Sequence, residues 1–214
     1  MTQILKLHST HPQRRLVRRA AEIVQAGGVI AYPTDTCYAL GCRLGDAAAA
    51  QRIRRLRGVD ERHHLTVVCR DLAEVGRFAR MDNAQFRIVR RGSDGAFTFL
   101  LRATHEVPRR VQHPKRSTVG VRIPQHPAVR ALLDALGEPI LSSTLLLPGD
   151  AEPLHDPGEI AVRLGNHIDA ILDAGMSETI PTTVVDLSTE PPRVVRRGRG
   201  DPAALGIEEV GQFG

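Results

Sequence analysis

The feature that most limits how this chain can fold is an apolar run that stops abruptly at a proline. Residues 29–32 (Val-Ile-Ala-Tyr) have the composition of a buried strand, and Pro33-Thr34-Asp35-Thr36 follows before apolar residues resume and end at Gly41. Two hydroxyls and a carboxylate therefore come directly after a strand. Open α/β sheets bind their ligands at the carboxyl edge, so this break is a candidate binding site. A plain turn between two strands is the alternative.

Five helices are predicted from apolar periodicity combined with end signals. The first stops at Gly27-Gly28, which suit a left-handed cap. The second begins after Asp46, a good N-cap, and ends at Gly58. The apolar face of the first helix consists of Leu16, Ala20, Ile23 and Val24, and the other helices are predicted at 47–57, beyond Asp71, at 85–91 and at 127–136.

Short apolar or alternating runs between these helices predict strands. The alternation of helices and strands favours the α/β class, and the later strands have fewer helices between them, which favours a mixed sheet. The 214 residues suffice for one full hydrophobic core and are few for two. We therefore predict a single domain over residues 10–200, with 201–214 as a loosely attached tail. The predicted strands are 29–32, 65–69, 96–101, 118–122, 139–143, 168–172, 183–187 and 193–195.

Composition limits the classes of partner. Apolar residues make up 42% of the chain and charged residues 25%, as in ordinary globular proteins. Aromatic residues reach only 3%, which argues against the stacking platforms that grip single-stranded nucleic acid. No apolar run is long enough to cross a bilayer, and the N-terminus lacks the apolar core of a secretory signal. We expect a cytoplasmic protein with no membrane partner.

Cysteine and histidine spacing indicates no metal site. Three cysteines, at 37, 42 and 69, are an odd number without a CxxC spacing, so neither a zinc site nor a disulfide framework is predicted. Cys37 has no assignable histidine partner for nucleophilic chemistry, and interior packing is the simpler role for all three. His63 and His64 fall in a loop after the second helix, where we expect them in solvent.

The positive charge is carried almost entirely by arginine. The net charge is +5, and lysine occurs only at positions 6 and 115. Each cluster alone has a plain alternative, a solvated face or, at 52–57, the cation-favouring end of a helix. Together the clusters favour an anionic partner such as a nucleotide or RNA, because the arginine fork suits phosphate and carboxylate groups. They lie at 52–57, 87–91, 102–122 and 193–199.

Ordered blocks along the chain resemble the YrdC/YciO family. The break at 33–36 is similar to the family's Pro-Thr-Glu-Thr or Pro-Thr-Asp-Thr strand end, and residues 118–124 are similar to its Val-x-Val-Arg-x-Pro strand. The other blocks are Gly27-Gly28, 98–101, 139–144, 182–187 and 196–198, so the resemblance spans roughly residues 15–200.

The resemblance implies both a fold and a reaction. The fold is a twisted α/β domain with a basic concave face. Synthases of the family combine L-threonine, bicarbonate and ATP into threonylcarbamoyl-AMP, which supplies N6-threonylcarbamoyladenosine in tRNA. Members are also described as binding double-stranded RNA or tRNA. The implied partners are ATP or AMP, L-threonine and RNA, with no tightly bound cofactor and Mg²⁺ only as the companion of ATP.

Two synthase motifs are altered in this chain. The Lys-x-Arg motif of the synthases falls on Arg57-Gly58-Val59, so one cation is kept and the other is lost; a register shifted by two residues gives Arg55-Leu56-Arg57. The Ser-x-Asn motif falls on Thr144-Leu145-Leu146, where leucine cannot replace the hydrogen bonds of an amide. This paired change resembles the YciO branch of the family and puts efficient synthesis in doubt.

The resemblance assigns substrate and nucleotide contacts to seven residues and catalysis to none. Thr34 and Thr36 have a local alternative, hydrogen bonds to their own turn. Arg57 has a helix-end alternative, and Arg122 places a charge on a core strand, for which an anionic ligand gives a reason. The seven residues are Thr34, Thr36, Arg57, Arg122, Ser142, Thr144 and Arg196.

Three functions remain open at this point. The first is a threonylcarbamoyl-AMP synthase. The second is an RNA-binding protein that has lost synthesis. The third is the handling of a different acyl-adenylate, which no residue specifically supports. Fold alone does not choose among them.

Overall fold

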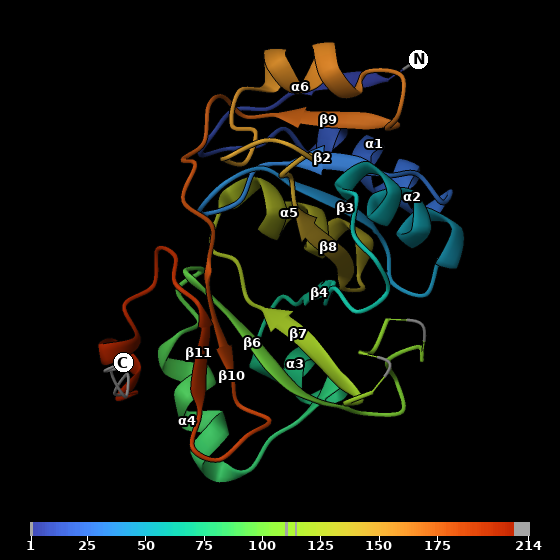
Figure 1. Cartoon of the computed structure of the whole chain (residues 1–214). Helices are drawn as coiled ribbons and strands as arrows, with labels where there is room; N and C mark the ends of the chain where they lie inside the picture. Colours follow the sequence, from blue (N-terminus) through green and yellow to red (C-terminus); the bar gives the residue numbers. More distant parts are fainter. Residues whose placement is uncertain (1, 110, 114, 208–214) are drawn as a thin grey trace.

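Eleven strands join into one sheet within the described part of the chain, shown in Figure 1. The computed structural model describes residues 2–109, 111–113 and 115–207. The sheet contains parallel pairs such as β1 with β9 and antiparallel pairs such as β2 with β3, which confirms the predicted mixed α/β class. The strands are β1 (Gln3–Lys6), β2 (Ile30–Tyr32), β3 (Ala39–Arg43), β4 (Thr66–Val68), β5 (Ala79–Arg80), β6 (Phe97–Ala103), β7 (Thr118–Arg122), β8 (Ile140–Thr144), β9 (Ala170–Asp173), β10 (Thr183–Asp186) and β11 (Arg193–Arg196).

The strand order brings distant polar segments together. The order is β1-β9-β2-β3-β8-β4-β7-β6-β10-β11, with β5 paired to β6 beside this path. Ser142 on β8 lies between Gly41 of β3 and Thr66 of β4. On the other side of β4, Val68 is aligned with Arg122 of β7. The three-residue strand β4 thus connects two halves of the sheet (Figure 1).

Six helices in the residues that the structure describes cover the sheet, and local sequence determines where each one starts and ends. Asp46 caps the second through Ala49 N at 2.9 Å. The first ends as predicted: Gly27 has a φ of 87°, and Gly28 N donates to Ile23 O at 2.9 Å, the double turn that a left-handed glycine permits. The helices are α1 (Arg14–Gln25), α2 (Ala47–Arg57), α3 (Leu72–Phe78), α4 (Asn83–Arg91), α5 (Pro127–Leu136) and α6 (Pro157–Leu164).

Two apolar clusters hold the helices on the sheet. The smaller cluster joins α1 and α5 to the strands at the β1 end, with residues such as Val24 and Leu133 fully buried. The larger one includes Ile53 of α2, Val75 of α3 and Ile160 of α6. Figure 1 shows α3 and α4 on the half that contains β6, β7, β10 and β11. Among the described helices none is long and apolar enough to cross a membrane; the longest, α1, has 12 residues.

The predicted elements agree with the structure except at the two ends and in three internal segments. β1, β3, β5 and α6 were not among the predicted elements. The sheet begins at Gln3, before the expected domain start at residue 10. The expectation of a loose tail is wrong up to residue 207, because Pro202–Leu205 forms a 3₁₀ turn and Leu205 and Ile207 are buried in the larger cluster. The rest of that tail, 208–214, lies outside the described residues.

Candidate functional site

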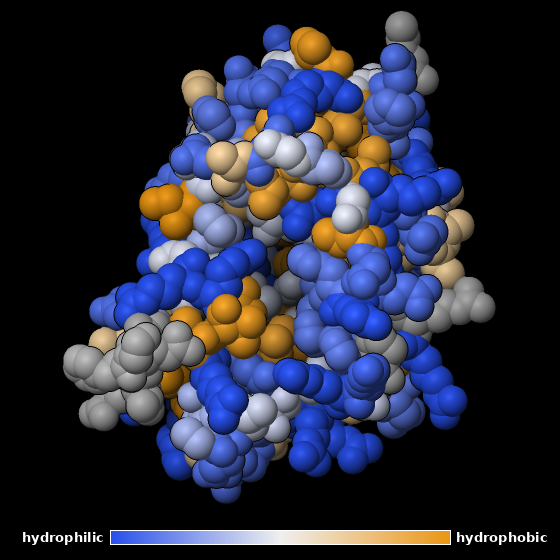
Figure 2. Space-filling model, in the orientation of Figure 1, coloured by the Kyte–Doolittle hydropathy of each residue, from blue (hydrophilic) through white to orange (hydrophobic). Residues whose placement is uncertain are grey.

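A cavity of about 280 Å³ opens on the face of the sheet where the two halves meet. Figure 2 shows the surface hollowed between them. No Asp or Glu within the described chain lines this cavity, whereas three arginines and many hydroxyls do. The polar wall consists of Arg62, Arg122, Arg196, His63, His64, Thr66, Thr98, Thr182, Ser142, Ser143 and Thr144, together with the Cys37 thiol.

Arg122 is held by the protein itself. Its Nη2 and Nε donate to Gly95 O at 2.8 and 3.1 Å, and Nη2 also reaches Asp35 Oδ2 at 3.4 Å and Thr36 Oγ1 at 3.3 Å. Burial lowers its pKa from the ordinary value, and the Asp35 carboxylate opposes that shift. From the sequence, an anionic ligand was the explanation offered for a charged residue on this core strand. In the structure, Asp35 and Gly95 already pair with this charge, although Arg122 still lines the cavity.

Gly95 allows this network to close. Its φ is 88°, and a Cβ there would collide with the Asp35 carboxyl group. Asp35 also accepts from Gln125 N at 3.0 Å. The polar break after β2 is therefore tied to the strand and loop that carry Arg122 and Gly95.

Thr34 and Thr36 serve the same turn. Thr34 Oγ1 donates to Cys37 O at 2.7 Å and accepts from Thr36 N at 3.3 Å. Both threonines are buried, and neither belongs to the cavity wall. The local alternative thus describes the Thr34 hydroxyl, whereas Thr36 Oγ1 also accepts from Arg122, and the contact of either threonine with a ligand stays a prediction.

Ser142 and Ser143 have opposite surroundings although they are neighbours. Ser142 Oγ is 2.6 Å from Tyr32 Oη and donates to Leu40 O at 3.2 Å. Burial raises the pKa of Tyr32 to about 12, so the phenol stays protonated. Ser143 Oγ is buried without a hydrogen-bond partner among the described atoms. Ser143, which sequence reasoning missed, therefore offers its hydroxyl to a ligand more freely than Ser142 does.

Arg196 and Arg57 differ in their access to the cavity. Arg196 lines it and uses one nitrogen to donate to Thr182 O at 2.8 Å. Arg57 does not line it; its Nη1 donates to Leu146 O at 2.7 Å. Burial lowers the pKa of both guanidinium groups, and the positive charge of Arg196 lowers the pKa of Arg57 further. The predicted phosphate contact of Arg57 stays untested.

The two histidines of the second loop correct the sequence expectation. His63 and His64 are half-buried and line the cavity instead of standing in solvent. His64 lies 2.8 Å from Thr118 Oγ1 and stacks on His113 with ring centroids 4.8 Å apart. Burial, followed by His113, lowers the pKa of His64 to about 4, and burial lowers that of His63. Both are neutral at pH 7, so the positive charge of the cavity comes from arginine.

Cys37 also lines the cavity, but not as an activated nucleophile. Burial raises the pKa of its thiol despite the nearby arginines, so the thiol is protonated at neutral pH. Within the described residues no group of three or more His, Cys, Asp or Glu is placed to hold a metal ion. A magnesium ion here would depend on phosphate oxygens of a bound nucleotide.

Comparison with known proteins decides the family. The profile of the Sua5/YciO/YrdC family, which carries the description "Telomere recombination", matches residues 22–198. The chain belongs to the Sua5/YciO/YrdC family. The Escherichia coli protein described as "Uncharacterized protein YciO" is 47% identical over 201 residues, 94% of this chain and 98% of the relative. A threonylcarbamoyl-AMP synthase of Halorhodospira halophila is 32% identical over 164 residues, 76% of this chain and 84% of the relative.

Solved structures of the Sua5/YciO/YrdC family confirm the fold. The crystal structure of E. coli YciO has a TM-score of 0.93 at 46% identity and covers 96% of this chain and 100% of that one. The crystal structure of P. abyssi Sua5 complexed with L-threonine has a TM-score of 0.85 at 25% identity and covers 92% of this chain and 58% of that one. The single mixed α/β domain is thus shared with YciO and with part of Sua5.

The altered motifs of this Sua5/YciO/YrdC member contact each other. Arg57 is bonded to the main chain of Leu146, and a Cβ on Gly58 would lie 2.7 Å from Pro148 Cγ. The segment that follows β8 therefore packs over the end of α2. Neither Val59 nor Leu146 reaches the cavity wall. Thr144 does, and its hydroxyl makes no hydrogen bond with the described residues.

Proposed function

We propose that the cavity binds a nucleotide, ATP or AMP, together with L-threonine, and that the protein is a threonylcarbamoyl-AMP synthase of low efficiency linked to tRNA modification. The observation that carries the proposal is the cavity wall: arginines and unpartnered hydroxyls without a carboxylate. Such a wall suits phosphate and carboxylate groups. The synthase names of relatives at about one-third identity and the L-threonine in the Sua5 crystal support the same chemistry.

The reaction makes demands that this wall meets in part. Threonine nitrogen and bicarbonate give a carbamate, with loss of water. A carbamate oxygen then attacks the α-phosphorus of ATP, and the bond to pyrophosphate breaks. Negative charge grows on the leaving pyrophosphate, where arginine cations stabilise it. We expect Arg196 and Arg62, which both line the wall, to supply these cations. The cation lost at Val59 and the amide lost at Leu146 explain why we expect a slow reaction.

Release of pyrophosphate tests the proposal. The protein with ATP and Mg²⁺ is expected to release pyrophosphate only when both L-threonine and bicarbonate are present. Omission of either one controls for plain ATP hydrolysis, and an authentic threonylcarbamoyl-AMP synthase controls for the assay. A rate at background with the control enzyme active would remove synthesis from the proposal. If the same preparation also fails to bind ATP, the proposal of nucleotide binding is contradicted as well.

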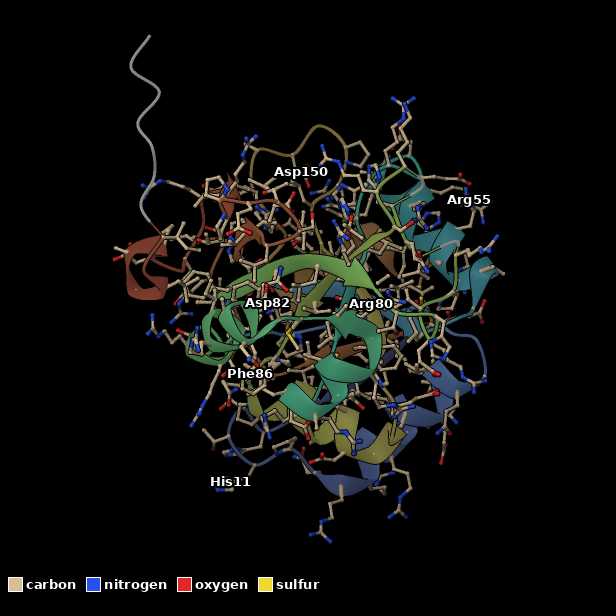
Figure 3. The ribbon with its side chains drawn as sticks, turned by 90° about the horizontal axis from the view of Figure 1, so that it is seen from below. His11, Arg55, Arg80, Asp82, Phe86 and Asp150 are labelled. Carbon is tan, nitrogen blue, oxygen red and sulfur yellow. The ribbon has the colours of Figure 1, made fainter. Side chains whose placement is uncertain are left out.

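RNA binding without synthesis is the second candidate, and a different surface favours it. A groove of about 490 Å³ is lined by Arg80, Arg102 and Arg116 with four hydroxyl side chains and no carboxylate from the described residues. Arg80 and Arg102 are aligned directly across β5 and β6, although like charges in that position repel. Figure 3 labels Arg80. Phosphates of an RNA backbone would relieve that repulsion.

The salt dependence of RNA affinity tests this candidate. We expect log K for a short RNA duplex to fall linearly with log salt, because bound phosphates release counterions. Arg80→Met combined with Arg102→Met should reduce the slope by about 1–2, since each lost phosphate contact removes about one unit. Arg14→Met combined with Arg15→Met, on α1, is the matched control and should keep the slope. An unchanged slope in the groove variant would place RNA elsewhere.

A further inference from the structure

Arg54 is a buried cation without an acceptor. The residue is 5% exposed, and its Nε and Nη2 are buried with no hydrogen-bond partner. Among the described residues it takes part in no ion pair. Burial of an unpaired guanidinium is strongly unfavourable, because the charge loses water and gains nothing in return. A residue of this kind needs a partner that the protein does not itself supply.

A second cavity of about 530 Å³ lies in front of this side chain. Arg54 shares one face of α2 with Gln51, Ala50 and Ala47, which precede it by three, four and seven residues and all line the cavity. Helical side chains lean toward the N-terminus, so the guanidinium points along this face toward the helix start. The two alanines leave the space that the cavity occupies. Its opposite wall includes Pro108 and Arg109.

The start of α2 supplies further donors. Asp46 caps Ala49 N, whereas the amides of Ala47 and Ala48 have no partner among the described residues. These amides carry the positive end of the helix dipole. The Asp46 carboxylate is occupied with its cap and lies against Gly27, where a Cβ would be 3.0 Å from its Oδ2. Glu61 is exposed at the rim and forms no ion pair with Arg54.

We propose that this second cavity is a binding site for a phosphate-type oxyanion, held by Arg54 and the first amides of α2. Arg109 adds a second cation to its wall. The site shares no lining residue with the candidate active-site cavity, so it goes beyond the proposed function. A free phosphate and a phosphate group of an RNA backbone have the same chemistry here, and the experiment below separates them.

Amide NMR of the full chain tests the proposal with a readout at the site itself. Titration with inorganic phosphate is expected to shift the Ala47 and Ala48 amides and the Arg54 side-chain N–H saturably. In Arg54→Met the two amides should no longer respond. Arg55→Met is the matched control, because Arg55 is exposed on the outer side of α2 (Figure 3) and lines neither cavity, and it should behave as the wild type.

The remaining outcomes show whether the bound phosphate group is free or belongs to an RNA backbone, and whether the site exists. A shift of the same amides with a short RNA duplex, but not with free phosphate, supports the site and assigns the backbone as its source. No shift with either probe overturns the site, as does an unchanged response in Arg54→Met. Arg196→Met changes only the candidate active-site cavity, so a retained response there shows that the two sites are separate.

Thermal unfolding gives an independent check. In phosphate-free buffer Arg54→Met should raise Tm by about 2–4 °C, because methionine keeps the length and removes an unpaired buried charge. Added phosphate should raise Tm of the wild type and leave that of the variant unchanged. A lower Tm for Arg54→Met in phosphate-free buffer would mean that the charge already has a partner in the protein, which overturns the proposal.

Discussion

Replacing Arg122 by methionine is expected to lower the free energy of unfolding by about 3–5 kcal/mol, the usual result of breaking a buried ion pair from one side. The guanidinium satisfies Gly95 O twice and pairs with Asp35, whose side chain is only 14% exposed. Methionine fills the space of the stem but leaves the Gly95 carbonyl without its donor and the Asp35 carboxylate without its cation, with only the Gln125 amide still donating to it. Urea denaturation followed by circular dichroism measures the change.

Two companion variants isolate the cause of that loss. Asp35→Asn in the Arg122→Met background removes the stranded charge and should recover part of the stability. Arg19→Met breaks an exposed pair with Glu22, whose side chains are 48% and 54% exposed, and should cost only about 0–1 kcal/mol. A free energy of unfolding for Arg122→Met within about 1 kcal/mol of the wild-type value would show that the hydrogen bonds of Arg122 to Gly95 and Asp35 do not stabilise the turn.

Arg196→Met should weaken ATP binding by about tenfold to a hundredfold, the range for a lost hydrogen bond to a charged group. Arg196 lines the cavity, and its contacts with Thr182, to O at 2.8 Å and to Oγ1 at 3.4 Å, use only one nitrogen of the guanidinium. Its side chain is largely at the surface, so the variant should fold normally. Isothermal calorimetry with ATP gives the affinity, and unfolding in urea confirms the fold.

Arg193 provides the matched control for that measurement. It lies on the same strand, β11, is exposed and does not line the cavity. Arg193→Met should therefore bind ATP as the wild type does, although it removes the same formal charge. Equal losses in the two variants would indicate a general field effect. An unchanged affinity in Arg196→Met would exclude this arginine as a phosphate contact.

The sequence predicted most elements because their end signals are local. Asp46, Gly27 and Pro127 each mark a helix end through their own backbone or cap geometry. Strand β3 was missed because its small residues, Ala-Leu-Gly-Cys, have weak strand preference alone and are fixed by pairing with β2 and β8. Helix α6 was missed because its Asp-Pro-Gly start is equally typical of a turn.

The candidate site was less predictable because its contacts join distant segments. Arg122, Ser142, Thr144 and Arg196 were named from the sequence and do meet at one cavity. Ser143 could not be distinguished from Ser142, because only the pairing of β8 with its neighbours shows which hydroxyl is already bonded. His63 and His64 were expected in solvent, since a loop's sequence does not reveal which strands it folds against. The isolation of Arg54 is likewise a property of packing.

The short strand β4 has a mechanical consequence. Only three residues, Thr66–Val68, hydrogen-bond to both β8 and β7, so the two halves of the sheet meet along a narrow seam. The cavity lies over that seam, with Ser143 on one side and Thr98 on the other. A ligand that contacts both residues restrains the two halves of the sheet relative to each other. Occupancy of the cavity and the stiffness of the whole sheet are then thermodynamically linked, even if no atom of the backbone moves.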